Sequence, residues 1–384
     1  MKKYFWMCFI FISMMFCTMP TFAANSITEL PNVKIVIDGQ IGTYKNIPIS
    51  IKDRTLLPLK EILVNLGVQD DNEHIIWNAN ERSVTIIKDS QKIFLKIDSN
   101  KATVNDKELI LDANPVIYKD KTYIPVKFIA QSLGMKVVWD GSSRSVLIRN
   151  LDEFNKIKDI IEKSNKAMAE VKNCKMKMDI SADTKQKSMS FNIGMQIDGS
   201  IDILNKKMYM NMKMNMAALN MNMDMYFADK TTYMKNPLTN EWEKETLSQS
   251  EYDEIFANNS TTDILDATGA LCAGLKEVES QKENEILLKG DVFLGDLINM
   301  ANQSSDISDV EFDKFNVQIS LDKNTYTINN IVMETNYHSK ENSLENANMK
   351  IKCDYSDYNS KIEIVIPEEA IKNAVENSDL ENGL

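Results

Sequence analysis

Apolar and polar residues alternate along much of the second half of the chain, most regularly between Met208 and Met216. Every second residue of this run is methionine, and the residues between are tyrosine, asparagine and lysine. Because successive side chains of a β-strand point to opposite faces, the run predicts a strand of roughly 30 Å with one apolar and one polar face. A short link at 217–220 and renewed alternation from Met221 to Met225 predict an antiparallel hairpin.

The same alternation occurs before this hairpin, at 176–180 and 189–197. We therefore expect an antiparallel sheet with one broad face rich in thioether side chains and one hydrated face. The residues predicted to form the apolar face, and to bind a hydrophobic ligand there, are Met176, Met178, Met189, Phe191, Met195, Met208, Met210, Met212, Met214, Met216, Met221, Met223 and Met225.

The rest of the chain after residue 150 supplies further strands and helices. Residues 151–172 contain neither Gly nor Pro and carry Ile157, Ile160 and Ile161 on one stripe, which predicts a linking helix. Residues 173–367 are predicted to form a curved antiparallel sheet, a half-barrel, with helices on its concave face, followed by a polar tail at 368–384. The strand patterns lie at 286–288, 317–321, 326–335, 347–355 and 362–366, and the helical patterns at 246–257, 262–273 and 294–300.

The first half of the chain contains an internal duplication. Arg54–Gly67 and Lys121–Gly134 share a short extended piece, a proline, an apolar stripe at helical spacing and a final glycine. The prolines suit a first helical turn, and Gly67 and Gly134 suit the left-handed residue that ends a helix. A strand with a tryptophan and a returning strand follow in each copy, which predicts a strand–helix–hairpin module used twice. With the curved sheet, this module predicts an α+β fold.

Both copies also carry the string T-[LY]-[LI]-P-[LV]-K, then L-G, then W, then R-S-V. This string resembles the copper amine oxidase N-terminal-like domain of secreted bacterial proteins, over about residues 33–150. The resemblance implies an α/β module, assigned to residues 25–150, that associates with the surface, a cell-wall component or a surface protein. It does not imply oxidase activity, because such enzymes hold copper with three histidines and this chain has only His74 and His338.

The second half resembles the lipoprotein-carrier class typified by LolA and the LppX/LprG-like proteins, over about residues 165–367. The nearest match is the segment Tyr226–Lys235, followed by Trp242. The resemblance implies a methionine-rich β domain at 173–367 that encloses a lipid or other amphiphile without covalent chemistry.

The first residues have the order of a secretory signal peptide, predicted at 1–23. Lys2 and Lys3 precede an apolar run at 4–16, and Pro20 and Ala23 fit the cleavage region. The run is too short for a lasting transmembrane anchor. A lipoprotein is disfavoured, because Phe16 rather than a small residue precedes Cys17. The expected location is therefore extracellular, in association with the cell envelope.

Composition excludes several functions. The net charge of −12 and the absence of a basic cluster argue against a nucleic-acid partner. Two separated histidines are too few for most hydrolytic triads and zinc hydrolases, so we predict no enzyme, no catalytic residue, no metal site and no cofactor. Cys174 and Cys353 either form a disulfide or, with Cys272, remain buried thiols; both alternatives stay open.

The methionines have three interpretations. An adaptable apolar surface for a ligand would use them, because methionine is flexible and polarizable. They could instead fill an ordinary core, in a structural or adhesive protein without a ligand, or bind Cu(I) through soft thioethers. Trp77 and Trp139 are interpreted as core residues, with exposed sugar-stacking platforms as the alternative. The overall hypothesis is a secreted, non-catalytic envelope protein with a wall-associated first module and a second domain that binds a hydrophobic ligand.

Overall fold

The computed structural model describes residues 27–42, 44–141, 143–186, 189–216, 219–252, 268–293, 310–312, 314–339 and 346–376. The signal peptide predicted at 1–23 and the helix predicted at 294–300 lie outside the described residues. The helices predicted at 246–257 and 262–273 lie partly outside them.

Contacts divide the chain into two compact units. The first comprises Met1–Asn32 and Tyr44–Leu133, and the second comprises Val33–Thr43 and Gly134–Leu384. Each unit is described by itself.

The first unit forms two sheets of five strands among its described residues, in the orders β1-β4-β5-β12-β11 and β10-β9-β8-β7-β6. Its core includes Ile49, Leu56 and Tyr123 from the first of these sheets. The strands are β1 (Thr28–Glu29), β4 (Ile49–Ile51), β5 (Arg54–Pro58), β6 (Ile75–Asn78), β7 (Ser83–Lys88), β8 (Gln91–Lys96), β9 (Lys101–Val104), β10 (Lys107–Ile110), β11 (Val116–Tyr118) and β12 (Lys121–Pro125).

Two short helices follow prolines in equivalent places, α2 (Leu59–Asn65) after Pro58 and α3 (Val126–Ser132) after Pro125. Gly67 and Gly134 stand just beyond the helix ends with φ angles of 81° and 74°. Such left-handed backbone ends a helix and favours glycine, as the sequence pattern indicates.

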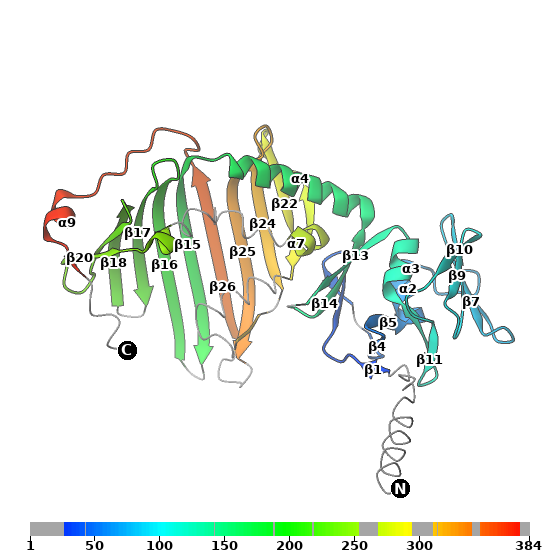
Figure 1. The fold of residues 1–384 in the computed structure, drawn as a ribbon. Coiled ribbons are helices and arrows are strands. Elements are labelled where there is room, and N and C mark those ends of the chain that lie inside the picture. The colour runs from blue at the N-terminus through cyan, green and yellow to red at the C-terminus, as the bar shows by residue number, and fades with distance from the viewer. Residues whose placement is uncertain are drawn as a thin grey trace, which may run out of the picture. The chain divides into compact units, whose positions relative to one another are not determined.

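The second unit combines a small sheet with a much larger one (Figure 1). The small sheet has the order β13-β14-β2-β3, with β2 parallel to β14. Its strands are β2 (Lys34–Ile37), β3 (Gln40–Ile41), β13 (Met135–Asp140) and β14 (Ser145–Asn150).

The described strands of the large sheet follow the order β21-β22-β24-β25-β26-β15-β16-β17-β18-β19-β20-β27, with β23 paired to β25. Almost every neighbouring pair is antiparallel, as expected for strands with one covered face. The strands are β15 (Asn173–Gln186), β16 (Met189–Asp202), β17 (Lys207–Met216), β18 (Leu219–Ala228), β19 (Thr231–Lys235), β20 (Trp242–Thr246), β21 (Leu275–Val278), β22 (Glu285–Val292), β23 (Val310–Phe312), β24 (Phe315–Asp322), β25 (Ile328–Ser339), β26 (Asn346–Ser356) and β27 (Val375–Glu376).

The core of the second unit lies where α4 (Leu151–Ala169) and α7 (Thr268–Gly274) pack together near β14, β21 and β22 (Figure 1). Asn150 begins α4 by accepting hydrogen bonds from the backbone N–H groups of Asp152 and Glu153, which satisfies groups that the first helical turn leaves unpaired. The buried stripe of α4 includes Phe154, Ile157 and Ile161. A further helix, α9 (Glu368–Asn373), contacts β19 and β20. Within the described residues, no helix combines the length and apolar character needed to cross a membrane.

The predicted fold class is wrong. The described residues are mostly β, with 53% strand and 17% helix, rather than a duplicated strand–helix module followed by a sheet with helices on its concave face. The apolar stripes that predicted helices in the first half support only seven residues each in α2 and α3. The strands around them extend and pair into large sheets, which therefore dominate the fold.

Two side-chain predictions are also settled. Trp77 and Trp139 do not fill the core, because 43% and 54% of their surfaces are exposed. Cys174, Cys272 and Cys353 are free and buried, so the disulfide alternative is wrong and the buried-thiol alternative is confirmed.

Candidate functional site

Methionines lie directly opposite one another across the middle of the large sheet. Between β17 and β18 the register pairs Met210 with Met225, Met212 with Met223 and Met214 with Met221. Directly opposed residues of antiparallel strands have Cβ atoms only about 5 Å apart, so these side chains are close neighbours on one face. We call this surface of β15–β19 the methionine face.

The methionine face continues the covered face of the same sheet. One row of opposed residues can be followed from β22 to β18 through Leu288, Ile319, Ile331, Cys353, Met178, Ile197, Met212 and Met223. In this row Leu288, Ile319 and Ile331 are fully buried, whereas Met178, Met212 and Met223 are half-buried. The apolar row therefore leaves the closed core and continues into partial exposure.

The predicted site residues are brought together by this register. Those with described side chains are all half-buried: Met176, Met178, Met195, Met208, Met210, Met212, Met214, Met221, Met223 and Met225. Met189 and Phe191 lie in β16 and Met216 in β17, and their side chains lie outside the described part of the chain.

The pattern of methionines missed several members of the face. Met234 on β19 lies opposite Met225, and Ile197 lies between Met178 and Met212. Both continue the same alternation, which could have identified them. Gly199 gives no such signal, yet it lies between Met176 and Met210, and its missing side chain leaves space between them.

The opposite face of the sheet is polar. On β17 and β18, the Asn211 amide donates a hydrogen bond to Asp224 at 2.8 Å, and the Tyr209 hydroxyl donates to the same carboxylate at 3.0 Å. The two faces of one hairpin therefore differ completely in chemistry, as strict alternation requires.

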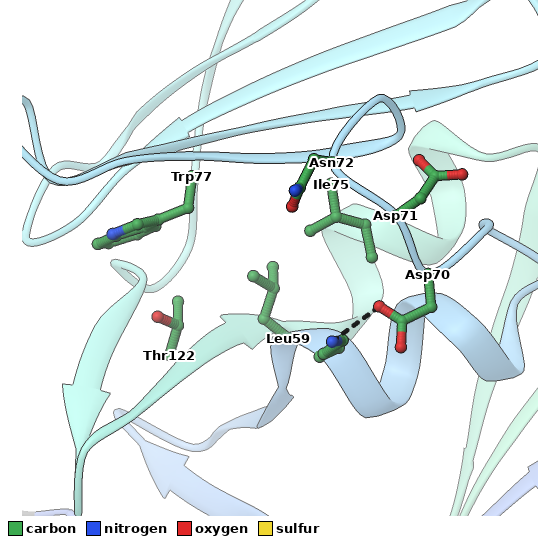
Figure 2. Close-up of a pocket in the computed structure, with 8 residues that line it drawn as sticks. Leu59, Asp70, Asp71, Asn72, Ile75, Trp77 and Thr122 are labelled. Carbon is green, nitrogen blue, oxygen red and sulfur yellow. Dashed lines mark ion pairs between the residues drawn. The ribbon is translucent and has the colours of Figure 1, made fainter.

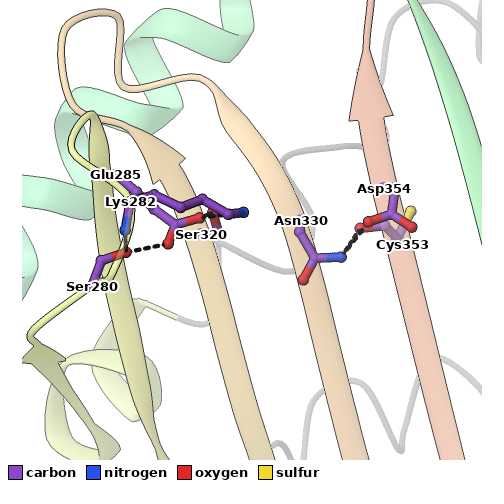
Figure 3. Close-up of polar contacts among 7 residues, drawn as sticks. All are labelled: Ser280, Lys282, Glu285, Ser320, Asn330, Cys353 and Asp354. Carbon is purple, nitrogen blue, oxygen red and sulfur yellow. Dashed lines mark hydrogen bonds and ion pairs between the residues drawn. The ribbon is translucent and has the colours of Figure 1, made fainter.

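Further along this polar face, a cavity of about 650 Å³ is bordered by β22, β24, β25 and β26. Figure 3 shows Glu285 between Ser280 and Ser320, and Asn330 donating to Asp354 at 2.6 Å. Burial alone would raise the pKa of the Glu285 carboxyl. Hydrogen bonds from Ser280 and Ser320, together with the Lys282 ammonium, outweigh it and keep that pKa below its usual value. The groups around Glu285 satisfy one another, and Asn330 and Asp354 form a separate polar pair.

Three of the cavities lined by described residues have no methionine in their linings. Searching the described part of the chain also gives no cluster of three or more His, Cys, Asp or Glu side chains placed to hold a metal ion. The methionine face is a half-buried apolar surface continuous with the core, and its predicted side chains offer no acid–base chemistry.

Comparison with known proteins gives two family matches. Residues 36–148 match the copper amine oxidase N-terminal domain, and residues 156–375 match a family of unknown function, DUF6612. Comparison with curated proteins gives no match.

Among solved structures, similar chains include LprF from Mycobacterium bovis, with 8% identity, a TM-score of 0.36 and coverage of 56% of this chain and 97% of that chain. The lipoprotein LppX from Mycobacterium tuberculosis has 10% identity, a TM-score of 0.33 and coverage of 55% and 99%. A DUF1329 family protein from Desulfovibrio piger has 8% identity, a TM-score of 0.20 and coverage of 56% and 95%.

The resemblances to the copper amine oxidase N-terminal domain and to LppX-type proteins are thus confirmed as resemblances. Identities and TM-scores this low transfer no ligand to this chain. The match at 156–375 spans more than half of the sequence, and the chain belongs to the family of unknown function DUF6612.

Proposed function

We propose that this protein is an exported, non-catalytic component of the cell envelope whose methionine face binds a lipid or another amphiphile. The observation that carries the proposal is the row of opposed residues that is buried as far as β26 and continues on β15–β18 as half-buried apolar residues, three of which are methionines.

The change of residue type along this row supports a binding role. Where the face is covered it carries Leu288, Ile319 and Ile331, whose branched side chains pack in defined rotamers. Where it is half-buried it carries unbranched methionines, which adapt to irregular apolar partners and have weaker β-propensity than branched residues. A face that only had to be filled would gain more from the branched residues used at its covered end.

The size of the face suits an acyl chain. From Met176 on β15 to Met234 on β19 the register crosses four strand spacings, which is about 19 Å at the usual separation of neighbouring strands. One acyl chain reaches about 15 Å, half the hydrocarbon thickness of a bilayer. Each methylene removed from water contributes about 0.8 kcal/mol, so a chain laid on this face would be held without covalent chemistry.

The first unit is proposed to associate with a cell-wall component or a surface protein. Its support is that the match to the copper amine oxidase N-terminal domain, residues 36–148, includes most of the first unit.

The binding proposal is tested by titrating the purified protein with a fluorescent fatty acid. Met212→Glu places a carboxylate on the methionine face, where an apolar ligand would bury it, and is expected to weaken binding at least about tenfold. Lys213→Glu introduces the same carboxylate on the exposed polar face one residue away, and is expected to leave the affinity unchanged.

Circular dichroism and thermal unfolding establish that both variants are folded, and Met212→Gln, of nearly equal length, replaces Met212→Glu if the charge prevents folding. Equal effects of the variants at positions 212 and 213, or no binding by the unmodified protein, would refute the proposal.

A purely structural role is the second candidate. The observation that favours it is that the methionine row is continuous with the buried residues Leu288, Ile319 and Ile331, because methionine also fills gaps in ordinary cores. In that case, the fatty acid does not bind, and Met212→Glu alters only stability.

A further inference from the structure

A cleft of about 460 Å³ lies wholly within the first unit, at the start of α2 and beside β6 and β12. Figure 2 shows that Ile75 and Trp77 reach it from the same strand, with Leu59 of α2 between them and the ion pair of Asp70. Its volume falls within the range typical of small-molecule sites, which combine apolar walls with a few polar groups.

Trp77 borders the cleft because β6 is an edge strand. It lies opposite Val84, and Ile75 lies opposite Ile86; both partners on β7 are completely buried. The register therefore places Trp77 on the core side of this sheet, but no further strand pairs beyond β6 within that sheet. Its indole consequently remains 43% exposed, whereas a tryptophan needed only for packing would be covered.

Polar groups surround this aromatic side chain. Lys60 Nζ and Asp70 Oδ1 form an ion pair at 2.8 Å, and both side chains are exposed. Asn72 points toward the cleft in Figure 2, and Thr122 lies below Trp77. Within the described part of the chain, the Asn72 amide and the Thr122 hydroxyl form no hydrogen bond to protein, so both are available to a ligand.

Asp71 also lines the cleft, but its carboxylate stabilises the backbone turn at residues 71–74 and is not free to bind a ligand. Its carboxylate accepts hydrogen bonds from the backbone N–H groups of Glu73 and His74 and contacts the His74 ring nitrogen Nδ1 at 2.7 Å. Because Asp70 is paired with Lys60 as well, neither carboxylate is left to select a cationic ligand. An anionic ligand is disfavoured by the same two carboxylates.

We propose that this cleft is a carbohydrate-binding site that takes one or two pyranose units of a polysaccharide. The apolar face of a pyranose ring stacks on the Trp77 indole above Leu59 and Ile75, which supply an uncharged floor. Ring hydroxyls both donate and accept hydrogen bonds, which matches the mixture of amide, hydroxyl, ammonium and carboxylate groups around the rim. Sugar binding at this site would explain how the first unit associates with the cell wall. The inference depends on that proposed association only for the natural source of the glycan.

The second copy of the duplicated module provides a matched control. Trp139 occupies the equivalent place in the sequence and is 54% exposed, but it does not line this cleft. Replacing either tryptophan by alanine removes an exposed indole, so only a site at the cleft would distinguish the two variants.

The test titrates the full-length protein with tetramers of N-acetylglucosamine, glucose in β-1,4 linkage and glucose in α-1,4 linkage, followed by calorimetry and tryptophan fluorescence. At least one tetramer is expected to bind. Trp77→Ala is expected to abolish this binding, Asn72→Ala to weaken it severalfold without altering the fold, and Trp139→Ala to leave it unchanged. Binding by none of the tetramers, or equal losses in the two tryptophan variants, would overturn the proposal.

Two further measurements separate this site from the proposed function. Trp77→Ala should bind fatty acid with the affinity of the unmodified protein. Met212→Glu should bind the tetramer with the affinity of the unmodified protein. If the protein binds a tetramer but is not retained by purified cell walls, the sugar site is supported and the proposed wall association is refuted. If the protein binds fatty acid but no tetramer, the lipid role is supported and the sugar site is refuted.

Discussion

Met176 of β15 and Met210 of β17 converge over Gly199 of β16, which lies opposite both of them. A Cβ atom added to Gly199 would lie 3.7 Å from both Met176 Cε and Met210 Cγ, which is ordinary van der Waals contact. The glycine thus leaves a shallow gap in the methionine face that an extra methyl group could occupy without displacing its neighbours.

Gly199→Ala is therefore expected to raise the free energy of unfolding by about 0.5–1 kcal/mol, because alanine loses less backbone entropy on folding. Gly290→Ala is the opposite case. Its added Cβ would clash with the Gly274 carbonyl oxygen, and we expect a loss of about 2 kcal/mol or more. Urea unfolding of the two variants checks both signs; a stabilised Gly290→Ala or a strongly destabilised Gly199→Ala would contradict the packing described for these strands.

Replacing Met210, Met212 and Met214 together by leucine distinguishes an apolar ligand from Cu(I). Leucine keeps the face apolar at similar volume, so fatty-acid affinity is expected to change less than about threefold. Thioether sulfur is the only soft ligand that these three residues offer a copper ion, and leucine removes it. A Cu(I) titration under reducing conditions is expected to give the same weak uptake for both proteins. Stoichiometric uptake that vanishes in the leucine variant would favour the copper interpretation instead.

The three described cysteines are expected to be unreactive in the folded protein. Burial raises the pKa of the Cys174 thiol to about 11, with a smaller contribution from nearby Cys353, and burial raises that of Cys272 to about 12. Because the thiolate is the nucleophile, a disulfide reagent at pH 8 should label these thiols only after denaturation. Rapid labelling of the native protein would show that the strands carrying Cys174 and Cys353 open readily.

The same pKa shifts determine a pH dependence of stability. A thiol whose pKa is raised by folding keeps its proton in the native state, while the unfolded chain releases it at lower pH. Above about pH 9 the unfolded state therefore binds fewer protons, and the free energy of unfolding falls as pH rises towards 11. Cys174→Ala should reduce this loss in urea unfolding measured between pH 8 and 11; an unchanged slope would contradict the assignment.

Local rules predicted much of the secondary structure. The alternation from Met208 to Met216 corresponds to β17, Lys207–Met216, because a period of two admits only a strand with two unlike faces. Gly67 and Gly134 take the left-handed backbone that their position after an apolar stripe indicates.

Properties that depend on tertiary neighbours could not be read in this way. The pattern placed Trp77 on a strand but could not show that β6 is the edge of its sheet, and so it failed to predict an exposed indole. The cleft joins Leu59, Trp77 and Thr122, which come from separate elements far apart in the chain. The fold-class prediction was wrong for a related reason. Apolar spacing indicated helices, but it could not show that α2 and α3 would be only two turns long and that large sheets would dominate the fold.

Native mass spectrometry of the protein purified from its own host, with organic extraction of the same sample, tests the role of the methionine face most directly. If the methionine face binds a lipid or other amphiphile, some of the unmodified protein is expected to have a mass that exceeds the polypeptide's by one such molecule, and the molecule is expected in the extract. This heavier population is expected to be lost in Met212→Glu and kept in Lys213→Glu. If all three proteins show only the mass of the bare polypeptide and the extract contains no lipid or other amphiphile, a lipid-binding role is contradicted and a structural role is favoured.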